Sequence, residues 1–299
     1  MRTLTRRSAV AIALAIALVV SLMPALAGAA APIVPTLVDI RAAHQPGYDR
    51  IVFEFAGGLP DVTRARWVAS PRLDPSDKPA KVQGNAFVQV RFRQAEAHDA
   101  EGPTVSPLRR AFDLPNIAHV VMLGDYEGEV SIGVGLMERT AIRKTYRLSE
   151  PARFVVDIDT AFPKQRVPVY FADDDRIVAG DPVVVSKVKR YVRKVDPKRG
   201  ALQRLYAGPT EEEKADRLRF ISSRTYGFHR LRTNRFGVTR VQLRGRCNSL
   251  GSAIVTVADQ MRATLMARPA VRWVKIYGPE GTTIWPRGRR HSDPYCLQP

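Results

Sequence analysis

Alternation of apolar and polar side chains, the pattern of a β-strand with one buried face, most constrains the fold of the first half of the chain. Ile51, Phe53 and Phe55 would share one face of such a strand, with Arg50 and Glu54 on the other. Other segments with strand character are residues 63–69, 87–93, 118–123, 130–136, 143–148 and 153–158. Because clusters of Gly, Pro and Asp separate these short segments, they predict an all-β sandwich.

The second half of the chain has a different pattern, in which strands alternate with helices. Strand-like segments at residues 167–171 and 183–195 precede a helical segment at residues 200–207. Thr210 begins a further helix, because Glu213 stands three residues later and completes a capping box. This order of elements predicts an α/β sandwich with helices on one face of a sheet.

A β-hairpin is predicted at residues 228–234 and 238–244, around a three-residue loop that ends in Gly237. Apolar residues then recur at helical spacing between residues 254 and 265, and residues 271–277 return to strand character.

The positive charge of the chain is concentrated in its second half. The formal net charge is +18, and residues 160–299 carry 28 Lys plus Arg against 12 Asp plus Glu. Residues 31–159 carry 16 Lys plus Arg against 17 Asp plus Glu, so this segment is close to neutral. Such a change in composition predicts a domain boundary, which we place at residues 162–165.

Residues 1–31 have the pattern of a secretory signal peptide. Arg2, Arg6 and Arg7 precede an apolar run, and small residues offer cleavage sites near residues 27–30. An uncleaved anchor is the alternative, and export by the general or the twin-arginine route is left open. Because no Cys lies near the leader, a lipoprotein is not predicted. A basic chain would ordinarily be expected to bind nucleic acid. If the protein is exported, the expected partners of its positive charge are instead cell-wall polymers, a membrane surface or acidic envelope proteins.

The chain has two cysteines, Cys247 and Cys296, which lie 49 residues apart. An even pair outside the cytoplasm favours a disulfide. The bond would tie the tail at residues 286–299 to the rest of the second half.

Two segments of the chain resemble known families. Residues 47–55 (GYDRIVFEF), 58–60 (GLP) and 154–157 (FVVD) resemble the AMIN-like domain of exported actinobacterial proteins, over residues 36–160. Residues 169–171 (VYF), 205–210 (LYAGPT), 264–265 (TL) and 274–277 (VKIY) resemble the GerMN domain of spore-germination proteins, over residues 165–285. The resemblance implies a non-catalytic protein of the cell envelope, associated with peptidoglycan and with sporulation or germination.

No motif for catalysis, a metal or a cofactor stands out in the sequence. The five histidines are far apart, so no local zinc pairing is predicted. Cys247 to Gly251 follow a predicted strand like a nucleophile elbow, but Cys247 replaces the first Gly of that motif. The alternative to a non-enzymatic protein is therefore a cell-wall hydrolase or transpeptidase that uses Cys247 or Ser249.

The predicted binding surface is a basic face in the second half. If the hairpin has the three-residue loop that ends in Gly237, Arg232 lies opposite Arg240. Arg230 lies opposite Gln242 on the same surface. Like charges placed opposite one another destabilise a sheet, so the arrangement favours a nearby anion, whereas the alternative is a solvated face that aids solubility. The candidate anion- or partner-binding residues are Lys187, Lys189, Arg193, Arg230, Arg232, Arg240 and Arg244. We predict that they bind peptidoglycan, an anionic glycopolymer or an envelope protein.

Overall fold

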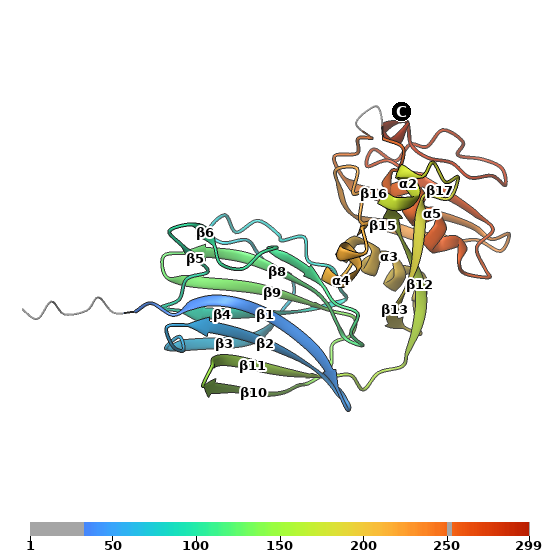
Figure 1. Cartoon of the computed structure of the whole chain (residues 1–299). Coiled ribbons are helices and arrows are strands. Elements are labelled where there is room, and N and C mark those ends of the chain that lie inside the picture. The colour runs from blue at the N-terminus through green and yellow to red at the C-terminus, as the bar shows by residue number, and fades with distance from the viewer. Residues whose placement is uncertain (1–32, 250–252, 299) are drawn as a thin grey trace, which may run out of the picture. The chain divides into compact units, whose positions relative to one another are not determined.

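The computed structural model describes residues 33–249 and 253–298 (Figure 1). The predicted signal peptide at residues 1–31 lies outside the described residues. Among the described residues, no helix is long and apolar enough to cross a membrane.

The first half of the chain consists of two antiparallel sheets. The four-stranded sheet has the order β1 (Thr36–Gln45), β2 (Tyr48–Ala56), β11 (Ala152–Asp159) and β10 (Ile142–Ser149). The five-stranded sheet has the order β3 (Val62–Val68), β4 (Ala86–Arg93), β9 (Glu129–Leu136), β8 (Ile117–Tyr126) and β7 (Arg109–Ala111). A separate short pair is formed by β5 (His98–Asp99) and β6 (Gly102–Pro103).

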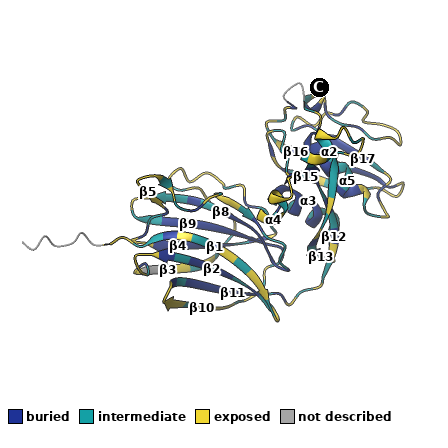
Figure 2. Ribbon diagram, viewed as in Figure 1, coloured by how far each residue is buried: buried dark blue, intermediate teal, exposed yellow. Residues whose placement is uncertain are grey.

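The inner faces of both sheets supply one apolar core. Ile51, Phe53 and Phe55 of β2 are buried, as the alternation predicts. Phe92 of β4 contacts Phe53 edge to face, with 5.2 Å between the ring centroids, and also contacts Phe154 of β11. Strand β9 is buried along most of its length, whereas the edge strand β10 is mostly exposed (Figure 2). The predicted all-β sandwich is confirmed for this half.

The loop between β3 and β4 covers part of the outer face of the five-stranded sheet. Its Val82 packs against Val121 and Leu123 of β8. Gly135 of β9 allows this close approach, since a Cβ at that position would overlap the carbonyl oxygen of Gln83. The part of this outer face that the loop does not cover is open to solvent.

The second half of the chain contains two three-stranded sheets and several helices. One sheet has the order β13 (Val185–Arg193), β12 (Lys164–Asp173) and β14 (Leu218–Arg219), and the other β15 (Thr225–Thr233), β16 (Val238–Gly245) and β17 (Trp273–Tyr277). The helices are α2 (Asp174–Val178), α3 (Pro197–Ala207), α4 (Glu211–Ala215) and α5 (Val257–Met266), with a 3-10 turn at Tyr295–Leu297. Buried residues of α3 and α5 share one apolar core with β12, β16 and β17.

Capping residues set the ends of these helices. Thr210 and Glu213 form the predicted capping box at the start of α4. Thr256 and Asp259 form a second one at the start of α5. The expected helical position of Ile254 is wrong, because α5 begins after Thr256 and the Ile254 side chain is exposed.

The predicted disulfide between Cys247 and Cys296 is present, with 5.6 Å between the two Cα atoms. Beside it, the backbone N–H of Ser249 donates to the carbonyl oxygen of Cys296 at 2.9 Å. The bond therefore joins the end of the chain to the segment that follows β16.

Candidate anion-binding site

The loop of the β15–β16 hairpin is closed by Asn234. Its backbone N–H donates to the carbonyl oxygen of Val238 at 3.1 Å, and its side-chain oxygen accepts from the backbone N–H of Phe236 and of Val238. Gly237 occupies the left-handed region with φ of 75°, where a side chain would be strained. The predicted three-residue loop is confirmed, and it determines which residues of the two strands face one another.

The two faces of the hairpin differ in polarity. Val241 and Leu243 of β16 lie in the apolar core, with Leu231 of β15 packed against them. Because successive side chains alternate across a strand, Arg232 and Arg240 lie on the opposite face. The register pairs these two arginines directly, as predicted.

A third cation extends this pair across the sheet. Strand β17 runs parallel to β16 and pairs Lys275 with Arg240. Lys275 is buried, and its Nζ donates to the carbonyl oxygens of Trp285 and Arg287. Burial, followed by the charge of Arg240, lowers the pKa of Lys275. We call Arg232, Arg240 and Lys275 the cation row.

The predicted pairing of Arg230 with Gln242 is wrong in register. Gln242 pairs with His229, because a bulge between His229 and Arg232 inserts one extra residue into β15. Arg230 lies in this bulge, and its φ is 51°, an uncommon value for a residue other than Gly. The side chain of Arg230 nevertheless contacts Gln242, since its Nη1 donates to Oε1 of Gln242 at 3.2 Å.

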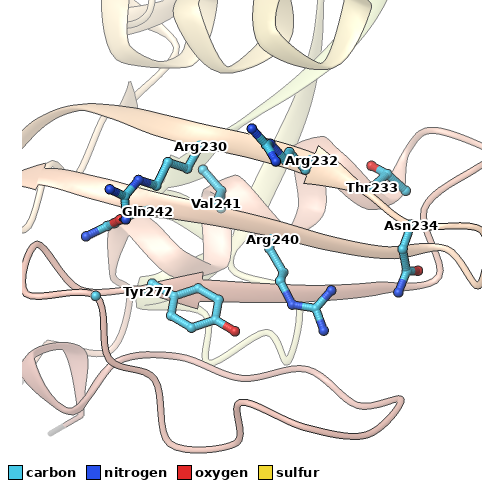
Figure 3. A pocket seen from close by; sticks show the side chains of 9 residues that line it. Arg230, Arg232, Thr233, Asn234, Arg240, Val241, Gln242 and Tyr277 are labelled. Carbon is cyan, nitrogen blue, oxygen red and sulfur yellow. The ribbon is translucent and has the colours of Figure 1, made fainter.

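An open pocket of about 620 Å³ lies on this face of the sheet. Figure 3 shows the labelled side chains, which come from both hairpin strands, the loop and β17. The polar lining combines guanidinium and amide donors with the phenol of Tyr277, and none of the described residues that line the pocket is acidic. Such a surface suits an anion, because guanidinium groups offer several donors at fixed angles to carboxylate or phosphate oxygens.

Several other arginines of the second half pair with acidic side chains, unlike the arginines of this pocket. Arg262 pairs with Asp293, and Arg176 pairs with Asp181 at 2.8 Å. Within residues 33–249 and 253–298, Arg230, Arg232 and Arg240 form no ion pair with an acidic side chain. Their charge is therefore neutralised only by solvent or by a bound partner.

The other predicted binding residues do not line this pocket. Lys187 and Lys189 are exposed on β13, which belongs to the other three-stranded sheet. Arg193 forms an ion pair with Glu138, with 2.8 Å between Nε and Oε2. Arg244 donates from Nε to Nδ1 of His229 at 3.0 Å. The structure thus brings together Arg230, Arg232 and Arg240 of the seven candidates.

The two residues considered as nucleophiles lie near the disulfide. The sulfur of Cys247 is bonded to Cys296, so it is not a thiolate while the bond persists. The Oγ of Ser249 donates to the carbonyl oxygen of Gln298 at 2.8 Å. In the part of the chain that the structure describes, no group of three or more His, Cys, Asp or Glu side chains is arranged to hold a metal ion.

Sequence reasoning missed Lys275, and it favoured a packing role for Tyr277 over contact with a ligand. The sequence predicts a strand at both residues, but nothing local indicates that this strand lies beside β16. The signal that was available is their alternation in residues 273–277, which places both side chains on one face.

The fold and the site define a protein in which a β-sandwich precedes a basic part built from strands and helices. Residues 35–160 match the family model of the AMIN-like domain, which confirms the resemblance of that segment. Comparisons with curated proteins and with solved structures gave no match. An AMIN-like domain suggests a cell-wall-related, peptidoglycan-binding role and an extracellular or cell-wall location.

Proposed function

We propose that the chain is an exported, non-catalytic protein of the cell envelope that binds the cell wall. The AMIN-like segment would localise it to peptidoglycan, and the leader at residues 1–31 would direct its export. The resemblance of residues 165–285 to the GerMN domain supports the same compartment and a role in wall assembly.

The pairing of Arg232 with Arg240 carries the second part of the proposal, which is that these two arginines of the cation row bind an anionic wall polymer. Like charges directly opposite one another in a sheet are destabilising, and Lys275 adds a third positive charge beside them. An anion on the open face would relieve this repulsion. A polymer with repeated negative charges is favoured over an isolated ion, because an open pocket gives a single ion little enclosure.

A pull-down with isolated cell wall, repeated over a salt series, tests this proposal. We expect the full chain to bind at low ionic strength and to be released as salt rises, because exposed charges are screened. The variant Arg232→Gln/Arg240→Gln should bind about fivefold more weakly. The matched control is Lys194→Gln/Arg246→Gln, which removes two exposed charges away from the pocket.

Two results would overturn the proposal. Equal wall binding by the Arg232→Gln/Arg240→Gln variant and the parent chain would exclude the cation row as the binding surface. Turnover of purified wall material by the parent chain, lost in Ser249→Ala, would exclude a non-catalytic role and favour the hydrolase or transpeptidase instead.

A further inference from the structure

The open part of the outer face of the five-stranded sheet carries four arginines. Arg64 and Arg66 come from β3, and Arg91 and Arg93 from β4. These four side chains line a pocket of about 210 Å³. We call them the arginine cluster. It lies within the segment that matches the AMIN-like domain, and it is separate from the cation row of the second half.

The sheet register forces these charges together. Arg64 pairs directly with Arg91, and Arg66 pairs with Gln89. Arg66 is therefore a diagonal neighbour of Arg91, at a separation of roughly 7–8 Å between backbones, which long side chains can span. A direct pair of like charges destabilises a sheet, so this arrangement has a cost in the absence of an anion.

One acidic residue of the sheet partly offsets the charge of the cluster. Glu129 of β9 contacts Nη1 of Arg91 through Oε1 at 2.8 Å. Its other oxygen contacts Nε of Arg93 at 3.2 Å. Both oxygens of this carboxylate are thus engaged by the arginines of β4.

The arginines of β3 have no such partner. Arg64 and Arg66 are exposed, and within the described parts of the chain their guanidinium groups form no hydrogen bond or ion pair. Glu129 holds Arg91 and Arg93 in place beside them, so the four cations and one carboxylate leave a net positive site. This occurs in a half of the chain whose overall charge is close to neutral.

We propose that the arginine cluster binds phosphate groups of an anionic polymer. A phosphodiester group of such a polymer has its two charged and two ester oxygens arranged as a tetrahedron, so several guanidinium groups can approach it from more directions than they can approach a planar carboxylate. The pocket has the size of a small oxyanion with its water, and among the residues that the structure describes, its lining offers no aromatic side chain on which a sugar ring would stack. The phosphate groups, rather than the sugars, are therefore what this site recognises.

Binding of a fluorescent glycerol-phosphate oligomer to the full chain tests the assignment. To keep Arg232 and Arg240 from contributing, the measurement uses the Arg232→Gln/Arg240→Gln background, so its result is independent of the proposed role of the cation row. We expect Arg64→Gln/Arg66→Gln to weaken binding about five- to tenfold. The matched control, Arg72→Gln/Lys78→Gln, removes two exposed charges from the loop between β3 and β4 and should bind like the background chain.

Two further readouts separate a site from general charge. A galacturonate oligomer of the same charge, which carries carboxylates, should bind more weakly than the phosphate oligomer. Without ligand, Arg64→Gln/Arg66→Gln should unfold at the same temperature as the background chain or a higher one, because the substitution removes repulsion. The increase in that temperature caused by the phosphate oligomer should then be lost.

Each contrary result overturns the proposal. Unchanged affinity of the Arg64→Gln/Arg66→Gln variant would exclude the cluster as a site, and an equal loss in the control would show a general charge effect. Equal or tighter binding of the galacturonate oligomer would exclude recognition of phosphate.

Discussion

Arg190 donates from Nη1 to Oε1 of Glu213 at 2.8 Å, and only 2% of the arginine side chain is exposed. The same glutamate accepts from the backbone N–H of Thr210 at 2.9 Å, as part of the capping box of α4. One carboxylate thus neutralises a buried cation of β13 and also caps the start of α4. The acidic run at residues 211–213 therefore has a packing role at Glu213 in addition to its favourable place at a helix start.

Removal of Glu213 should destabilise the protein strongly. We expect Glu213→Ala to lower the free energy of unfolding by about 3 kcal/mol, because it leaves Arg190 buried and unpaired. Urea denaturation measures this change. Glu211→Ala is the control, since Glu211 is exposed and pairs with Lys214 within one turn, and it should cost less than about 0.5 kcal/mol. Equal effects of the two substitutions would contradict the structural role of the Arg190 pair.

The disulfide should contribute to stability through the loop that it closes. A loop of 49 residues corresponds to about 4 kcal/mol in the chain-entropy model, so Cys247→Ser/Cys296→Ser should lower the free energy of unfolding by up to that amount. Thiol titration of the unfolded, unreduced parent chain should detect no free thiol. Detection of two thiols would show that the bond does not form.

Phe92 is the centre of the aromatic core of the sandwich. Its ring is fully buried and lies 4.9 Å from that of Phe55, centroid to centroid, in addition to its contacts with Phe53 and Phe154. Phe92→Ala should therefore cost about 3–5 kcal/mol in the free energy of unfolding. Thermal and urea unfolding check the value. Tyr126→Ala, at an exposed position, should have little effect, and a small effect of Phe92→Ala would contradict the packing described here.

His98 should give the sandwich a dependence on pH. A hydrogen bond to Asp125, with 2.6 Å between Nδ1 and Oδ2, raises the pKa of His98. Because folding raises this pKa, the protonated His98 stabilises the folded protein. The contribution is fully present at a pH below the ordinary histidine pKa, and it is lost as the pH rises through the raised pKa. In an NMR titration of the His98 ring, the midpoint should lie above 6.5 in the parent chain and fall in Asp125→Asn. Identical midpoints would contradict this prediction.

Much of the sandwich and of the helix boundaries follows from local patterns. Alternation in residues 49–55 predicts β2 and its buried face, because a strand whose one face is in a core must alternate. The pair Thr210 and Glu213 predicts the start of α4, because the capping interaction lies within four consecutive residues. The two cysteines predict their own bond, since the chain contains no others.

The hairpin loop predicts that Arg232 lies opposite Arg240, but the other pairings in the candidate sites are contained in no local pattern. The bulge at Arg230 shifted the register of the hairpin by one residue, and strand β17 brought Lys275 beside Arg240. The register of β3 and β4 placed Arg64 against Arg91 in a half of the chain that is close to neutral overall. The sequence alone indicated most of the long strands, although not β1, and it determined which half is basic, because periodicity and composition are properties of the chain itself. Only the tertiary structure decided that Lys275 joins Arg232 and Arg240, and that Arg64 meets Arg91, because register, bulges and strand order result from long-range pairing and packing.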